Sequence, residues 1–184
     1  MTSKMQEIFD KMTPEQRKEV GEAISEMMGM PEEKLIHTFK GVAQKIVIES
    51  ADGALYIPPE PGQEIKQRLT INRNGKVTLS RYFSGDYSLV PPTADTRTTR
   101  RYSGKDTNEL MDLLAECFKK PYVPAHICDT GIWVVALWNE DGERFSYSGS
   151  LGSSPVSKYN LSMFARYALK MDTLWMFDGT PADD

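Results

Sequence analysis

Residues 126–152, HICDTGIWVVALWNEDGERFSYSGSLG, decide the fold because they predict a β-hairpin. Seven apolar residues, 132–138, precede the turn residues NEDG, and a segment in which aromatic and polar residues alternate follows the turn. β-Branched and aromatic residues favour strands, and alternation is typical of a strand with one face in solvent. The pattern therefore predicts a buried strand paired with a half-exposed one.

The turn of this hairpin determines which side chains point inward. A two-residue loop at Asp141-Gly142 would place Glu140 opposite Glu143, and like charges that face each other are unfavourable. A three-residue loop with Gly142 in the left-handed region pairs Asn139 with Glu143 instead, and we expect this register. It predicts an inner face made of Trp133, Val135, Leu137, Phe145 and Tyr147, with Trp138 and Arg144 on the other face.

The rest of the chain predicts more strands and several helices. A period of two and Gly-containing turns predict hairpins over 45–57 and 66–83, an edge strand over 97–103 and a final strand over 173–177. Helical spacing predicts helices over 106–119, capped by Asp106, and over 161–169. The sequence thus favours an α+β fold, in which a meander-like antiparallel sheet of about six to eight strands is built from three hairpins and carries helices on one face.

The N-terminal residues predict a helical segment over 1–44 that docks on the α+β domain of residues 45–180, with a disordered tail over 181–184. The last of the three helices expected in this segment begins at Pro31 and buries Phe39. The many methionines of these helices could form an adaptable binding groove, but packing against the sheet is favoured.

The composition restricts the function. The 184 residues suffice for one ordinary core, and two cysteines are too few for a disulfide framework or a four-ligand zinc site. We expect no cofactor and no metal. The charged N-terminus does not resemble a signal peptide, and no apolar run is long enough for a bilayer, so we expect a cytoplasmic protein without membrane contact.

The net charge of −4 is unevenly distributed. Residues 1–61 carry −4, residues 62–105 carry +6 and residues 106–184 carry −6. The basic segment could bind an acidic or phosphate-bearing partner, or the acidic segments could neutralise it on folding, which is the favoured interpretation.

Alternation within the basic segment predicts an exposed face of cations, hydroxyls and a few aromatic rings. Such a face could follow a nucleic-acid backbone, or it could simply protect an edge strand from pairing with other chains. The candidate binding residues are Lys66, Arg68, Lys76, Arg97, Arg100, Arg101 and Tyr102.

Candidate chemistry gathers at His126, Cys128 and Asp129. On a strand, His126 and Cys128 would lie about 7 Å apart, too far for a thiolate–imidazole hydrogen bond, and two ligands do not make a metal site. A buried cysteine at a strand start is favoured. The loop 149–155, GSLGSSP, could cradle a phosphate but lacks a phosphate-binding pattern.

These observations favour a small non-enzymatic interaction protein that binds another protein, through the basic face, the loop around Tyr87 or the methionine-rich helices. Small, acidic α+β proteins of this kind are similar in size and pattern to immunity-type and inhibitor proteins, a similarity that does not specify function. The alternatives are nucleic-acid binding through the basic face and a small enzyme built on His126, Cys128 and Asp129.

Overall fold

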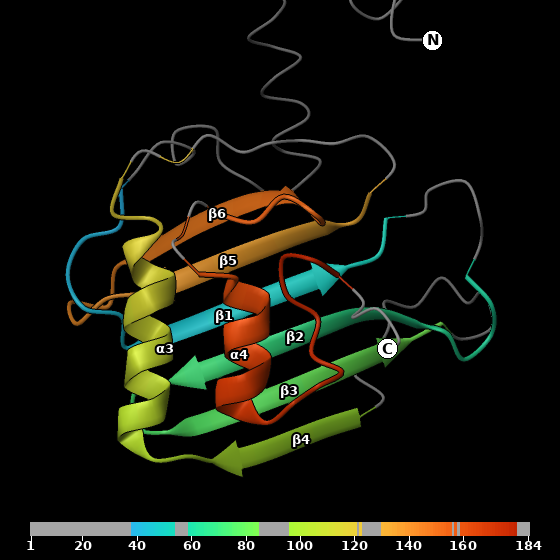
Figure 1. Cartoon of the computed structure of the whole chain (residues 1–184), viewed down its shortest axis with the longest axis horizontal. Helices are drawn as coiled ribbons and strands as arrows, with labels where there is room; N and C mark the ends of the chain where they lie inside the picture. Colours follow the sequence, from blue (N-terminus) through green and yellow to red (C-terminus); the bar gives the residue numbers. More distant parts are fainter. Residues whose placement is uncertain are drawn as a thin grey trace, which may run out of the picture. The chain divides into compact units, whose positions relative to one another are not determined.

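Six strands form one antiparallel sheet in the computed structural model, which describes residues 38–53, 59–84, 96–120, 122, 130–155, 157 and 159–179 (Figure 1). The strands are β1 (Lys45–Ala51), β2 (Glu64–Asn72), β3 (Lys76–Phe83), β4 (Thr96–Arg101), β5 (Ile132–Trp138) and β6 (Arg144–Ser150). The helices are α3 (Gly104–Glu116) and α4 (Leu161–Leu169). All described residues belong to one unit, His37–Asp184. The helices expected before residue 38 lie outside the described residues.

The strand order is β4-β3-β2-β1-β5-β6, and every neighbouring pair is antiparallel. The first four strands form a meander. The chain then passes through α3, crosses one face of the sheet and returns as β5 beside β1 (Figure 1). The predicted antiparallel α+β class is confirmed.

The hairpin of β5 and β6 has the register expected from charge repulsion in its turn. The Asn139 N–H donates to the Glu143 carbonyl at 3.1 Å, and Gly142 has a φ of 80°. Trp138 pairs with Arg144, which places Trp133 on the inner face. The hairpin of β2 and β3 is likewise confirmed, with Ile71 opposite Val77.

One predicted strand pairing and one predicted strand are wrong. Of the hairpin expected over 45–57, residues 54–57 lie outside the described residues. Residues 45–51 form β1, but its two edges are occupied along their whole length by β2 and β5, so β1 cannot pair with the strand expected next in the chain. The expected final strand over 173–177 is instead a loop whose only bridge, among the described residues, joins Met176 and Gly179. In both places the local pattern is compatible with a strand, but the sheet has no free edge there.

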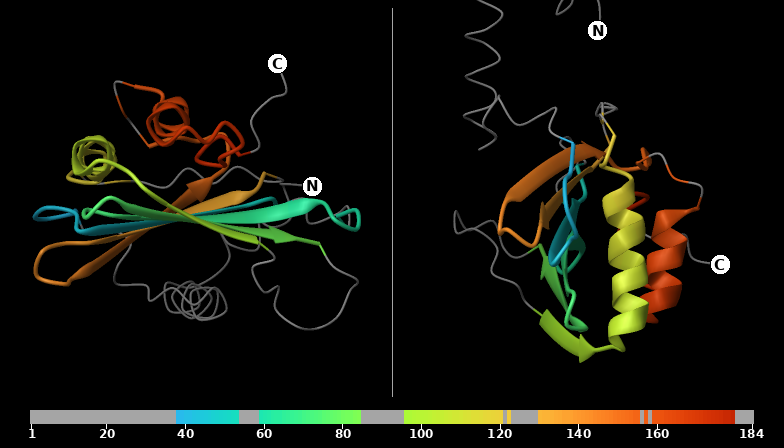
Figure 2. Two further views of the ribbon diagram at one scale, coloured as in Figure 1. Left: turned by 90° about the horizontal axis from the view of Figure 1, so that it is seen from below. Right: turned by 90° about the vertical axis from the view of Figure 1, so that its left-hand side faces the viewer.

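The helices cover one face of the sheet (Figure 2). The Ser103 side chain, rather than Asp106, caps α3: its Oγ accepts from the Asp106 N–H at 3.3 Å and donates to the Asp106 carboxylate at 2.7 Å. The apolar stripes of both helices bury Leu110, Leu114 and Leu161 against the sheet. We call this side of the sheet the covered face.

An aromatic cluster fills one end of the covered face. Trp133 is fully buried, and its indole N–H donates to the Ser153 carbonyl at 2.9 Å. Gly149 lies opposite Trp133, and a Cβ there would come within 2.5 Å of the indole ring, so only glycine fits. Phe118 stacks on Tyr147 with ring centroids 4.2 Å apart. Phe39, expected in a helix, has no helical structure but is buried in this core.

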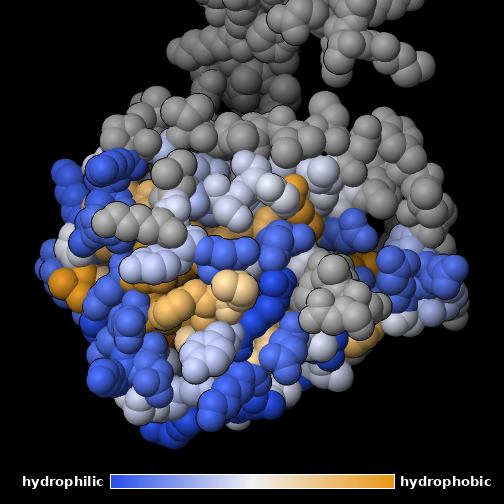
Figure 3. Space-filling model, viewed as in Figure 1, coloured by the Kyte–Doolittle hydropathy of each residue, from blue (hydrophilic) through white to orange (hydrophobic). Residues whose placement is uncertain are grey.

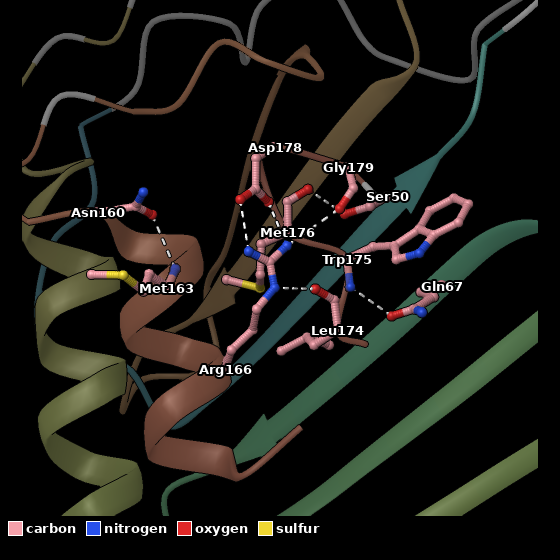
Figure 4. A network of polar contacts seen from close by, with 10 residues as sticks. All are labelled: Ser50, Gln67, Asn160, Met163, Arg166, Leu174, Trp175, Met176, Asp178 and Gly179. Atoms are coloured by element: carbon pink, nitrogen blue, oxygen red, sulfur yellow. Dashed lines mark hydrogen bonds and ion pairs between the residues drawn. The ribbon is translucent and has the colours of Figure 1, made fainter. Parts of the chain in front are cut away.

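The segment after α4 is tied to the sheet by buried polar groups (Figure 4). Gln67 accepts from the Trp175 N–H at 2.8 Å and donates to the Thr173 carbonyl at 2.9 Å. Arg166 of α4 holds the same segment through two 2.8 Å hydrogen bonds to the Asp178 carboxylate. These bonds explain how a loop, rather than a strand, completes the layer over the sheet.

Candidate binding surface

Alternate residues of all six strands form a second face, opposite α3 and α4, which we call the basic face. Within the described part of the chain, no helix lies on this side (Figure 2). Strand pairing fixes which side chains belong to it. Its charged members are Lys45, Lys66, Arg68, Lys76, Arg97, Arg101, Arg144 and the single carboxylate Glu49.

Glu49 neutralises only part of this charge. It forms an ion pair with Lys66 and lies 3.4 Å from the Arg68 guanidinium. The side chain of Arg68 remains 46 % exposed. Partly exposed pairs of this kind contribute little to stability, and the exposed Arg68 guanidinium stays accessible to a partner.

The β3–β4 end of the basic face carries the least compensated charge. Lys76 lies directly opposite Arg101, and both are exposed. Like charges in this position destabilise a sheet. Among the described residues, no carboxylate lies within ion-pair distance of Lys76, Arg97 or Arg101. The like charges of Lys76 and Arg101 therefore do not contribute to the stability of the sheet.

At the other end, an indole separates two cations. Trp138 of β5 has Lys45 of β1 on one side and Arg144 of β6 on the other. The Lys45 Nζ lies 4.5 Å from the ring centroid, and the Arg144 guanidinium carbon lies 5.5 Å from it. Lys66 makes a similar contact with Tyr82 at 5.4 Å. Cation–π contacts restrict the conformations of these charged side chains, so less conformational entropy is lost when a partner binds them.

Five of the seven predicted binding residues lie on this surface, namely Lys66, Arg68, Lys76, Arg97 and Arg101. Arg100 and Tyr102 do not. Arg100 lies opposite Val77 and donates to the Lys170 carbonyl at 3.2 Å, and the Tyr102 hydroxyl donates to the Leu169 carbonyl. Both hold the C-terminal end of α4, on the covered face.

Sequence reasoning left Lys45 and Arg144 out of the candidate site. Arg144 was placed beside Trp138 by the hairpin register, and that contact is confirmed. Lys45 joins them only because β1 pairs with β5, and no local pattern near Lys45 indicates that distant pairing.

The candidate catalytic residues His126, Cys128 and Asp129 lie outside the described residues, as does the loop around Tyr87. The other cysteine, Cys117, is half-buried against the core, and burial raises the pKa of its thiol. A thiol with a raised pKa is a poor nucleophile. In the described ranges, no group of three or more His, Cys, Asp or Glu side chains is placed to hold a metal ion.

Three consecutive amides of the glycine- and serine-rich loop 149–155 are already hydrogen-bonded within the protein. The N–H groups of Leu151, Gly152 and Ser153 donate to the carbonyls of Gly131, Phe177 and Ser150. The loop also supplies the carbonyl that accepts from the Trp133 indole. It closes the core rather than opening a site.

The outer surface of the helix layer differs in character from the basic face. A small apolar patch lies there among hydrophilic side chains (Figure 3). Tyr159, just before α4, and Met163 and Tyr167 within α4 are exposed large hydrophobic side chains spaced four residues apart. The four acidic residues of α3 lie on the same layer, where Glu116 pairs with Lys119 and Asp178 pairs with Arg166. This layer therefore carries charges of both signs, unlike the predominantly cationic basic face.

The fold and surface define a class of protein: an antiparallel α+β protein with one face of the sheet covered by helices and a cationic opposite face. Comparison of the sequence with protein-family models, and with curated proteins, found no match. No described helix has the length and apolar character needed to span a lipid bilayer.

Proposed function

We propose that this chain is a non-enzymatic interaction module that binds an acidic region of another protein through the basic face. The observation that carries the proposal is the charge imbalance on that face: seven cations accompany one carboxylate, although the whole chain carries −4. Cations concentrated on one face of an acidic protein favour a partner of opposite charge and accelerate its encounter.

The state of the aromatic rings favours a protein over a nucleic acid. Proteins that bind single-stranded nucleic acids use exposed rings on which bases stack. Here Trp138 has a cation on each side, and Tyr82 has Lys66 over its ring. These rings orient cations toward carboxylates rather than offering a free surface to a base.

Charge reversal on the basic face tests the proposal. The variant Lys76→Glu/Arg97→Glu changes two exposed residues, and the matched control Lys105→Glu/Lys120→Glu makes the same charge change at exposed positions outside the basic face. Binding of fluorescent poly-glutamate and of a single-stranded oligonucleotide would be measured by anisotropy at low and physiological salt.

We expect poly-glutamate to bind the unmodified chain and the control alike, and the Lys76→Glu/Arg97→Glu variant to lose at least roughly tenfold in affinity. Equal loss in the control would overturn the proposal, because it would reflect only net charge. Tighter binding of the oligonucleotide, with a steep dependence on salt, would replace the acidic protein by a nucleic acid.

A further inference from the structure

Strand β4 forms one edge of the sheet, and all six of its residues are exposed. No described strand lies beyond it (Figure 1). An edge strand presents unpaired N–H and C=O groups that can pair with another strand. β4 is therefore a place where the basic face could be extended by a segment of a partner.

The hydrogen bond that follows β4 shows which of its backbone groups face outward. The Tyr102 N–H donates to the Gly75 carbonyl at 2.9 Å, so at this position the backbone points toward β3. The direction of the backbone N–H and C=O groups alternates along a strand. Those of Thr96, Thr98 and Arg100 therefore also point toward β3. The N–H and C=O groups of Arg97, Thr99 and Arg101 point toward the open edge.

The side chains of these same three residues lie on the basic face. Thr99 lies between the two arginines, and its hydroxyl is 3.1 Å from that of Thr78. A strand added beside β4 would thus place alternate side chains next to Arg97, Thr99 and Arg101. Side chains directly opposite each other in a sheet lie about 5 Å apart, close enough for ion pairs.

Charge decides which strand can occupy the edge. A second copy of β4 would bring arginines against arginines, which disfavours self-pairing. A segment with carboxylates four residues apart would instead pair one carboxylate with Arg97 and the other with Arg101. Opposite charge would select such a segment, and backbone hydrogen bonds would supply affinity that does not depend on its other side chains.

We propose that β4 binds an extended acidic segment of the partner as a seventh strand, with Asp or Glu at positions n and n+4 facing Arg97 and Arg101. This inference rests on the proposed function, since it names how the acidic partner is held. It differs from that function in requiring the backbone of β4 as well as its charge.

The test uses a capped heptapeptide with Glu at its second and sixth positions, Thr at the fourth and Val or Thr elsewhere. Two N-methylated versions serve as controls, one blocking the peptide edge that would face β4 and the other blocking the opposite edge. Hydrogen exchange at Arg97, Thr99 and Arg101 reports directly on strand addition, because bound amides exchange more slowly. We expect the unmethylated peptide and only one of the methylated versions to bind and to slow this exchange.

Two substitutions at one position separate backbone from side chain. Thr99→Pro removes an outward N–H without changing charge, and proline is tolerated on an edge strand where the N–H faces solvent. Thr99→Val keeps the N–H and removes the hydroxyl. We expect Thr99→Pro to weaken peptide binding by roughly tenfold and Thr99→Val to leave it within about threefold.

Unchanged binding by Thr99→Pro, with loss only on charge reversal at Lys76 and Arg97, would overturn strand addition and leave the proposed function standing. Absence of peptide binding while poly-glutamate still binds would have the same meaning. Failure of both probes would overturn both proposals. Concentration-dependent dimerisation that Thr99→Pro abolishes would give the edge to a second copy and overturn the acidic occupant.

Discussion

The covered face and the basic face belong to the same six strands, yet alternate residues give them opposite properties. On the covered face, Trp133 is fully buried and its indole N–H has a partner. On the basic face, Trp138 is partly exposed and lies between two cations. The difference shows that one face carries the stability of the fold, whereas the other is free to carry charge that the fold does not need.

The largest expected contrast is between the two tryptophans. Trp133→Ala would remove a buried ring from the aromatic cluster and should reduce the free energy of unfolding by about 3–5 kcal/mol. Trp138→Ala removes a half-exposed ring and its cation–π contacts, and should cost about 1 kcal/mol or less. Urea denaturation measures both. Similar losses at the two positions would contradict the division between the faces.

The next contrast uses neighbouring residues of β2. Gln67→Met keeps the volume of the side chain but leaves the Trp175 N–H and the Thr173 carbonyl without this partner, and should cost about 1–3 kcal/mol. Arg68→Met, on the basic face, should change stability by about 1 kcal/mol at most. The comparison fails if Arg68→Met is the more damaging of the two in the same denaturation assay.

Alkaline pH should destabilise the protein through Tyr147, a residue of the covered face. Burial raises the pKa of Tyr147 to about 12 from its ordinary 10. Between these values the unfolded chain loses the phenolic proton while the folded chain keeps it. The contribution of Tyr147 to the free energy of unfolding is therefore fully present below pH 10 and falls as the pH rises toward 12. The slope due to this group is at most about 1.4 kcal/mol per pH unit. Denaturation between pH 9 and 12 should show a shallower decline in Tyr147→Phe, and an identical decline would contradict this assignment.

The smallest expected effect is an increase in stability, unlike the losses described above. Arg101→Glu would convert the like-charge pair with Lys76 into an ion pair, and should raise stability by about 0.2–1 kcal/mol at low salt. Arg97→Glu, opposite Ser80, should give no such gain. The same Arg101→Glu change should weaken binding of poly-glutamate. A loss of stability at low salt in thermal denaturation would show that this pairing is not a strain on the fold.

Local chemistry predicted the elements whose partners are close in sequence. Repulsion between Glu140 and Glu143 was enough to predict which of the two tryptophans faces the core, and Trp133 is the buried one in the structure. The error over 45–57 has the reverse cause: Asp52-Gly53 resembles a hairpin turn, but β1 pairs with strands that a local pattern cannot indicate.

The candidate surface was predictable in part. Alternation along 66–83 places Lys66, Arg68 and Lys76 correctly on one face. The same rule, applied to β4, separates Arg100 from Arg101, since adjacent strand residues point to opposite faces. That signal was present in the sequence, whereas the contribution of Lys45 depends on long-range pairing and was not.

The position of β1 between β2 and β5 has a consequence for how the chain is made. A ribosome releases β1 to β4 first, and these strands can pair with one another at once. The second edge of β1, with the consecutive residues Ile46, Val47 and Ile48, stays unpaired until synthesis has passed Trp138. During that interval the nascent chain exposes an apolar, strand-forming edge of the kind that aggregates. The last third of the protein thus acts as protection for the first strand of its own sheet.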